Sequence, residues 1–412
     1  MANLAQGLRV TTSVQLSTKP QRVRMAIVLG ALTALGPLSI DMYLPALPGL
    51  ARDLHTTASL AQLSLTFFLL GLALGQLLAG PFSDIRGRRV PLLGGLIIYS
   101  VSSLLCALSP SAWMLIVLRF LQGLAGAAGI VIARAIARDL YSGSKLTKFV
   151  SRLMLVNGAA PVLAPIAGGQ LLRFTSWHGV FVVLTVVGIS LFMAVFFWIP
   201  ETLPVASRAR GGIGNTLGVL RQLVCDRTFM GYALAQGMVS AAMFAYISGS
   251  PFVLQNIFGV SPQMFSLLFA INSFGIIIAG QVTGRLAGII SETKLFTTGI
   301  GISFLGGISL LVAILTKAGL FPILPPLFMV VSSVGIVGSA GFSLAMQNQG
   351  HAAGSASGLL GVLSFILGAF AAPLVGLGGS HTAIPLGVVI AAAGFGSVLC
   401  YMFLIRRRIA KV

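Results

Sequence analysis

Apolar stretches of about 20 residues, the length of a helix that crosses a hydrocarbon core of about 30 Å, recur along nearly the whole chain. Short polar segments separate them. Twelve such stretches fit, at 25–47, 58–82, 90–108, 112–136, 146–173, 176–199, 227–254, 262–286, 293–316, 322–345, 355–377 and 383–405. The pattern predicts an all-α membrane protein with twelve transmembrane helices.

The composition agrees with a membrane location and argues against an enzyme. Hydrophobic residues make up 57% of the 412 residues and charged residues 8%, which is more apolar surface than a soluble core could hide. An intramembrane enzyme would need a nucleophile with a base or a metal cluster. Seven acids, four histidines and three cysteines without a CxxC pair offer neither. We therefore expect no catalytic residue, metal or cofactor.

The basic residues indicate the orientation in the membrane. With the N-terminus in the cytoplasm, 22 of the 26 Lys and Arg residues fall in cytoplasmic segments, three fall outside and Arg119 lies within a span. This asymmetry follows the positive-inside rule, so the net charge of +19 is not a sign of nucleic-acid binding. The first 24 residues lack the apolar core of a signal peptide. We expect a multi-pass protein of the bacterial cytoplasmic membrane with both termini inside.

The spans divide into two sets of six. A segment rich in Pro, Gly and Arg interrupts the apolar pattern after the sixth span. The predicted units are a cytoplasmic N-terminal segment at 1–24, a first six-helix unit at 25–199, a linker at 200–226, a second unit at 227–405 and a basic tail at 406–412.

A weak internal repeat supports this division. Gly75, Gly80 and Asp84 of the second span recur 200 positions later as Gly275, Gly280 and Gly284. Two similar six-span halves are typical of one large class of transporters.

Asp41 is the carboxylate that we place deep inside an apolar segment. Such a charge costs about 2.5–3.5 kcal/mol at the centre of a membrane helix, so it persists where it lines a polar cavity or exchanges a proton. We predict that Asp41 carries a proton and contacts substrate. The alternative is a structural role, as a salt bridge or a helix cap, near the breaks that Pro37 and Pro45 can cause.

Arg119 lies in the fourth span, in the stretch LRFLQGLAGAAG, with Gln122 one helical turn away. An arginine does not deprotonate at working pH, so it cannot itself carry the proton, but it can tune a nearby carboxylate. We predict that Arg119 takes part in proton coupling. A purely structural role is the alternative.

The loop after the second span reads GPFSDIRGRR, residues 80–89. Gly80 and Gly87 permit a tight turn, Asp84 can accept hydrogen bonds, and Arg88 and Arg89 place charge at the inner surface. The loop resembles the G-x-x-x-D-x-x-G-R-R/K motif of the major facilitator superfamily, which locks the cytoplasmic side in the outward-facing state. The resemblance implies that Asp84 is a gate residue. A generic positive-inside turn is the alternative.

The fifth span contains NGAAPVLAPIAGG, residues 157–169, and is similar to the kinked helix of antiporters in that superfamily. The similarity assigns the kink to Pro161, Pro165, Gly168 and Gly169. Ala160 and Ala164 stand where the family pattern has glycines. Close packing of helices would explain the same composition.

Three segments narrow the resemblance to the bicyclomycin and chloramphenicol resistance branch, Bcr/CflA: PLSIDMYLPALP at 37–48, RAIARDLY at 134–141 and FAYISGSPFVLQ at 244–255. The resemblance implies the major facilitator fold, with two pseudo-symmetric six-helix bundles. It also implies export of small hydrophobic antibiotics, of the bicyclomycin or chloramphenicol/florfenicol type, in exchange for protons. A proton-coupled importer or exporter of a small metabolite would share the fold.

The drug pocket is expected to be mostly apolar with a few polar anchors. Its candidates are Asp41, Gln122, Met154 and Asn157 from the first half and Gln236, Phe244, Tyr246, Phe252 and Asn272 from the second. Some of these could instead be packing residues or interhelical hydrogen-bond partners. The expected partners are a small hydrophobic drug, protons and the lipid bilayer, and we expect a monomer without nucleic acid.

Overall fold

The computed structural model describes residues 19–141, 143–205, 208, 218, 221–347, 349, 353–379 and 381–406. These residues form twelve long helices: α1 (Lys19–Asp41), α3 (Ala58–Arg86), α4 (Arg89–Ala107), α5 (Ala112–Leu140), α6 (Gly143–Leu171), α7 (Trp177–Trp198), α9 (Arg227–Phe252), α10 (Pro262–Leu286), α11 (Glu292–Leu315), α12 (Leu320–Met346), α13 (Ala353–Val375) and α14 (Ile384–Cys400). Short helical segments are η1 (Leu44–Ala46), α2 (Leu47–Asp53), η3 (Val253–Ile257), η5 (Gly376–Gly378) and η6 (Tyr401–Arg406). The prediction of an all-α chain with twelve long helices is confirmed.

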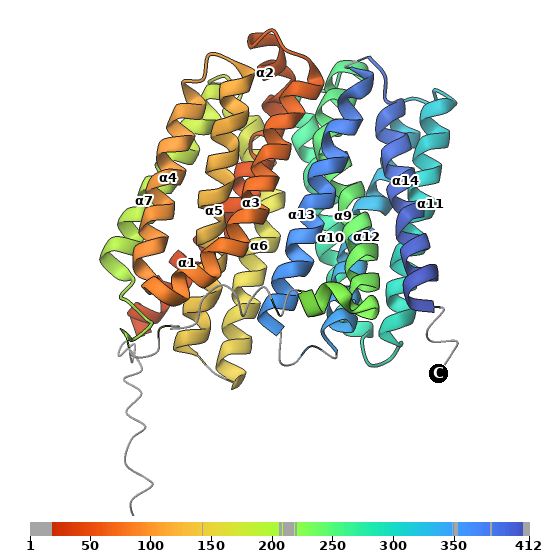
Figure 1. Ribbon diagram of the computed structural model, residues 1–412. Helices are drawn as coiled ribbons and strands as arrows, with labels where there is room; N and C mark the ends of the chain where they lie inside the picture. The colour runs from red at the N-terminus through yellow and green to blue at the C-terminus, as the bar shows by residue number, and fades with distance from the viewer. Residues whose placement is uncertain are drawn as a thin grey trace, which may run out of the picture.

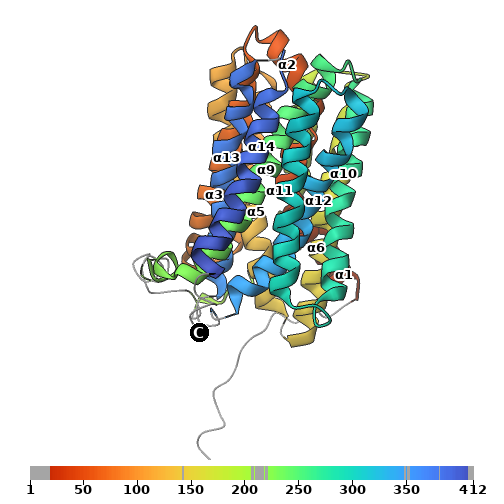
Figure 2. The same ribbon diagram turned by 90° about the vertical axis from the view of Figure 1, so that its right-hand side faces the viewer.

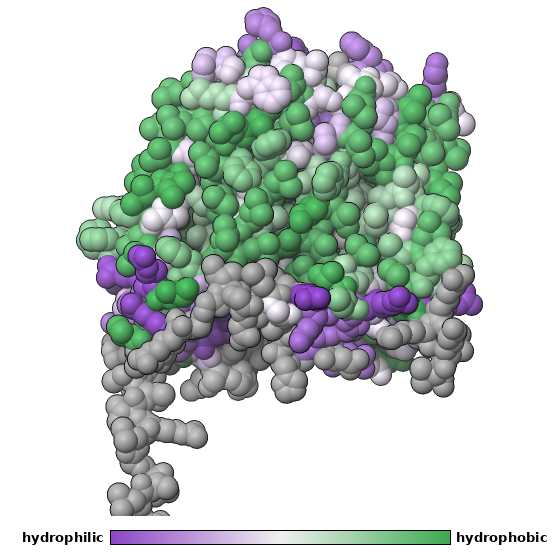
Figure 3. Space-filling model, in the orientation of Figure 1, coloured by the Kyte–Doolittle hydropathy of each residue, from purple (hydrophilic) through white to green (hydrophobic). Residues whose placement is uncertain are grey.

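Eleven helices of the described part are long and apolar enough to cross a membrane. The twelfth long helix is α6, and the side chains of several residues in its first half, Met154 among them, lie outside the described residues. On the face seen in Figure 3, hydrophobic residues cover the middle and hydrophilic residues lie toward both ends. This distribution matches a protein embedded in a bilayer.

The helices form two bundles that lie side by side (Figures 1 and 2). The first bundle contains α1 and α3 to α7, and the second contains α9 to α14. The bundles meet where α3 packs on α13 and where α6 packs on α10. In each contact the second long helix of one bundle meets the fifth of the other, which is the pairing that an approximate two-fold axis produces. The predicted fold of two pseudo-symmetric bundles is confirmed.

The two ends of the molecule differ in what they carry. The start of α1, the connection between α3 and α4, and the end of η6 lie at the lower end in Figure 1, which we call the terminal end. The segment α2 lies at the upper end, which we call the opposite end. The connection between α9 and α10 also lies there.

The first span differs from its predicted form because α1 stops at Asp41 rather than continuing to residue 47. Pro37 is accommodated inside α1, but Pro45 and Pro48 stand at the first turns of η1 and α2. A proline there starts a new helix and cannot donate to the preceding one. The helix therefore ends at Asp41, and this residue lies at a helix end rather than in the middle of a continuous span.

Glycines allow close approach of helices within each bundle. A side chain at Gly71 of α3 would strike the backbone of Phe120 in α5, and one at Gly123 would strike the backbone of Phe68. In the second bundle, Gly335 of α12 packs in the same way on the backbone of Ile276 in α10. Small residues at such crossings are the usual means of tight helix packing in membranes.

Candidate functional site

Asp41 lies at the junction of the two bundles with only 4% of its surface exposed. Its carboxylate is close enough to act electrostatically on the Tyr246 hydroxyl of α9, in the second bundle. That hydroxyl accepts a hydrogen bond from Asn272 Nδ2 of α10 at 2.8 Å, and the Tyr246 ring stacks on Phe269 with centroids 5.4 Å apart. The structure thus brings together three residues of the predicted pocket, Asp41, Tyr246 and Asn272.

Arg119 is fully buried in the first bundle, inside a set of aromatic rings. Its guanidinium carbon lies 4.2 Å from the ring centroid of Phe68, 5.0 Å from that of Tyr43 and 5.6 Å from that of Phe181. Aromatic faces attract a cation that has been taken out of water. Both ion pairs of the described chain are made by Arg88, so the Arg119 guanidinium is balanced by rings and dipoles rather than by a paired carboxylate.

Arg119 also caps the end of α1. Its Nη2 donates to the Ser39 carbonyl oxygen at 3.0 Å, which is one of the last carbonyls of that helix. The negative end of a helix dipole favours such a cation. Its Nη1 donates to Gln122 Oε1 at 2.5 Å, and Gln122 Nε2 donates to Ser103 Oγ at 2.7 Å. Arg119 therefore acts on the segment that carries Asp41 through the backbone two residues earlier, and both amide atoms of Gln122 are used within the first bundle.

The remaining pocket candidates are more dispersed. Phe244 is buried, and its ring lies 5.8 Å from that of Phe365 in α13. Phe252 lines a small cavity near the opposite end together with Gln62. Gln236 and Asn157 are half-buried, and Gln236 Oε1 lacks a hydrogen-bond partner in the described chain. The side chain of Met154 is outside the described residues.

The predicted gating loop is the centre of a charged cluster at the terminal end. Arg88 is 6% exposed, and its guanidinium contacts Asp84, donates to Ser83 Oγ at 2.8 Å and donates from Nε to Asp139 Oδ2 at 2.9 Å. Burial alone would lower the pKa of Arg88, but the hydrogen bonds to Asp139 and Asp84 outweigh it and raise the pKa above its ordinary value. The cluster ties the end of α3 to the end of α5.

Glu201, directly after the sixth span, is a member of this cluster that the sequence analysis missed. Its carboxylate accepts hydrogen bonds from the backbone N–H groups of Arg88 at 2.8 Å and Arg89 at 3.1 Å, so it caps the start of α4. Burial opposes ionisation, but these N–H donors and that of Leu203 lower the pKa of Glu201 below its ordinary value. An acid following Pro200 at the end of an apolar span was the available signal.

The proline- and glycine-rich stretch of α6 lies against both bundles. Pro161 and Pro165 fall inside the helix. Gly168 packs on the backbone carbonyl of Met42, the residue after Asp41, and Gly169 packs on Ser266 of α10. These glycines let α6 approach the broken end of α1 and the second bundle.

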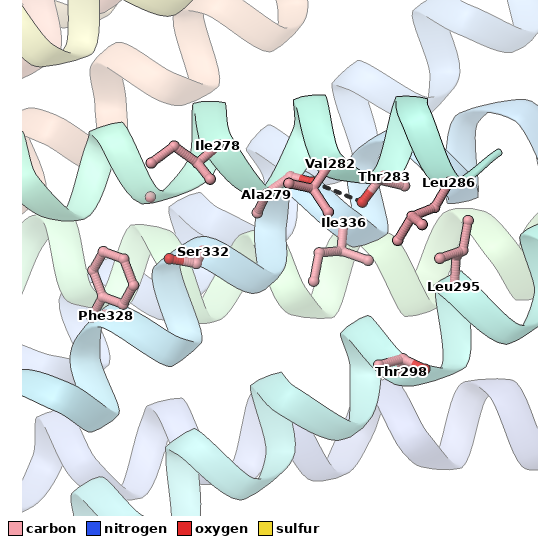
Figure 4. A pocket seen from close by; sticks show the side chains of 11 residues that line it. Ile278, Ala279, Val282, Thr283, Leu286, Leu295, Thr298, Phe328, Ser332 and Ile336 are labelled. Atoms are coloured by element: carbon pink, nitrogen blue, oxygen red, sulfur yellow. Dashed lines mark hydrogen bonds between the residues drawn. The ribbon is translucent and has the colours of Figure 1, made fainter. Parts of the chain in front are cut away.

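A cavity of about 270 Å³ lies elsewhere, between α10, α11 and α12 of the second bundle. Figure 4 shows its mostly apolar lining, with Ile278 and Val282 on α10, Phe328 on α12 and Leu295 on α11. Its lining includes no residue of the predicted drug pocket.

Comparisons with known proteins agree with this arrangement. The sequence model described as Major Facilitator Superfamily matches residues 29–373. A Bacillus subtilis protein named "Uncharacterized MFS-type transporter YdgK" is 43% identical, with 96% of this chain and 98% of that protein covered. A Haemophilus influenzae protein named "Bicyclomycin resistance protein homolog" is 32% identical, with 93% and 96% covered. The crystal structure of a D-xylose-proton symporter superposes with a TM-score of 0.73 over 93% of this chain and 98% of that one, at 14% identity, and supports the fold alone.

Proposed function

Because this chain belongs to the Major Facilitator Superfamily, a family of transporters, we propose that it exports small hydrophobic antibiotics in exchange for protons. The observation that carries this proposal is a buried carboxylate, Asp41, placed at a helix break where the two bundles meet. The relative named for bicyclomycin resistance makes antibiotics of that type the first substrates to test, with chloramphenicol or florfenicol next.

The orientation follows from the distribution of charge. The terminal end carries the excess of Lys and Arg, so we place it in the cytoplasm of a bacterium, with the opposite end outside. A monomer suffices, because each chain contains both bundles and the junction between them.

Coupling needs only one site whose occupants exclude each other. Asp41 takes up a proton when the junction opens to the outside and releases it inward before a drug molecule occupies the same space. A proton that enters down a 100 mV potential releases about 2.3 kcal/mol. Each pH unit adds about 1.4 kcal/mol. One proton can therefore sustain a ratio of roughly several hundred between the outside and inside concentrations of an uncharged drug.

The drug pocket lies on the second-bundle side of Asp41 in this proposal. Tyr246 and Asn272 supply hydrogen-bonding groups there, and Phe269 supplies an aromatic face beside Tyr246. A few polar anchors on an apolar wall suit a small uncharged antibiotic.

Drug-driven proton movement across proteoliposomes tests the proposal. We expect Asp41→Asn to abolish proton release on drug addition while the protein still elutes as a single species from a sizing column. Glu292→Gln is the matched control, because Glu292 accepts from Ser343 Oγ at the terminal end and an amide oxygen can accept the same bond. Full exchange by Asp41→Asn would refute the coupling role.

Drug susceptibility separates export from the alternative of metabolite transport. Expression in a host that lacks its own efflux pumps should make cells more resistant to the antibiotics, and a protonophore should remove the resistance. Increased sensitivity to a toxic metabolite analogue, with unchanged antibiotic resistance, would instead favour uptake of a metabolite.

A further inference from the structure

The contacts between the two bundles have an unusual chemistry. In the described part of the chain, three side-chain hydrogen bonds join the bundles, and each runs from a glutamine amide to a backbone carbonyl of the other bundle. The donors are Gln62, Gln255 and Gln263, which we call the glutamine latch. All three donors lie toward the opposite end, and the described ion pairs lie within the first bundle.

Gln62 of α3 is the innermost of the three and only 1% exposed. Its Nε2 donates to the Ser248 carbonyl oxygen of α9 at 3.1 Å. Its Oε1 has no hydrogen-bond partner in the described chain and lies against Gly376, just after α13. A side chain at position 376 would strike this amide and would lie 2.7 Å from Ser59 Cα. Gly376 therefore allows the close contact in which Gln62 forms its bond.

The other two glutamines stand on either side of the connection between α9 and α10. Gln255 Nε2 donates to the Pro45 carbonyl oxygen at 3.2 Å, and Gln263 Nε2 donates to the Gly169 carbonyl oxygen at 3.0 Å. Gly169 is in the last turn of α6, where helix carbonyls lack partners within the helix. One short segment of the second bundle thus holds two elements of the first, η1 and α6.

We propose that the glutamine latch holds the opposite end closed, and that the bundles separate there only when these three hydrogen bonds break. Neutral amides suit this task because water can replace them at little net cost, whereas breaking a buried ion pair leaves an uncompensated charge. Each bond shifts the ratio of closed to open molecules by about two- to tenfold. The latch concerns the opening of the bundles and holds for any cargo.

The test uses Gln→Met substitutions, which keep side-chain length and remove the donor. The background carries Cys225→Ser and Cys400→Ser, since these thiols are exposed and half-buried, and keeps the buried Cys106. A cysteine replacing the fully buried Ser250 of α9 reports opening, because its reaction rate with a maleimide is proportional to the open fraction even when opening is rare. We expect each single variant to raise this rate about two- to tenfold, and the triple variant to raise it most.

A distance measurement supplies a second readout. Spin labels on Phe174→Cys and Phe321→Cys lie on different bundles at the opposite end, where these residues are 87% and 82% exposed. We expect a longer distance to gain population in the latch variants. Gly376→Ala should produce the same changes by steric displacement, without altering any glutamine.

Gln170→Met is the matched control, because Gln170 is exposed and adjacent to Gly169 but makes no described bond between the bundles. It should behave as wild type. Should Gln255→Met, Gln263→Met and Gly376→Ala all fold and leave the labelling rate and the distances unchanged, the latch is refuted. Neither measurement needs a drug or a proton gradient, so failure of antiport in the wild type would leave this result intact.

Discussion

The connections that follow the second helix of each bundle occupy equivalent places but differ in chemistry. Between α3 and α4, Arg88 is buried among Asp84, Asp139 and Ser83. In the last turn of α10, just before the connection to α11, Arg285 is exposed and Gly284 stands where the sequence repeat has Asp84. The two halves thus share the helix plan, while the charged cluster of the described residues lies in the first half. The same helix plan therefore carries different chemistry at the terminal end of each half.

Removing Arg88 should have the largest effect of the changes considered for these two connections. We expect Arg88→Ala to lower the free energy of unfolding by about 3 kcal/mol, because it leaves Asp139 without its buried partner. Arg285→Ala should change it by less than about 0.5 kcal/mol, as is usual for exposed positions. Thermal unfolding of the two purified variants in the same detergent measures the difference. Equal effects would mean that the cluster does not stabilise the first bundle.

Two glycines with similar φ angles, one in each connection, test the same difference. Gly87 and Gly288 both have positive φ, at 92° and 90°, so alanine strains either backbone by about 1–3 kcal/mol. A side chain at Gly87 would also approach the Glu201 carboxylate, whereas nothing lies within 4 Å at Gly288. Gly87→Ala should therefore lower the melting temperature further than Gly288→Ala. A larger loss for Gly288→Ala would contradict the assigned contact.

The smallest expected effect concerns pH. Because the pKa of Glu201 is lowered in the folded protein, its contribution to stability is complete above the ordinary carboxyl range and disappears as the pH falls through the folded value. Glu201→Gln should therefore be less stable than wild type at pH 7, and the difference should shrink on acidification toward pH 4. Melting temperatures across this range measure it. A constant difference would exclude the charge of Glu201 as its source.

The helices were predictable because twenty-residue apolar stretches leave little choice in a membrane. The predicted span 262–286 coincides with α10, for example. The first span was harder, since apolar residues continue past Asp41 and only the prolines at 45 and 48 reveal the break. The surroundings of Asp41 depend on where the next helix starts, and a hydropathy pattern does not predict that position.

The partners of site residues were beyond sequence reasoning for a different reason. Arg119 meets Phe68, Tyr43 and Phe181, which belong to separate segments of the first bundle, and no local spacing relates them. Glu201 caps the start of α4, although it follows Arg89 by 112 positions in the sequence. The latch glutamines could not be identified from the sequence, because a glutamine near a span end is common and its acceptor is a backbone carbonyl that no residue type marks.

The hydrogen bond from Arg119 to the last turn of α1 has a mechanical consequence. An arginine keeps its charge at every working pH, so this attachment does not weaken when a neighbouring carboxyl gains or loses a proton. We therefore expect the end of α1 to stay attached to α5 during transport. On this expectation Asp41 keeps its place relative to the first bundle, and Tyr246 and Asn272 of the second bundle change their distance from it.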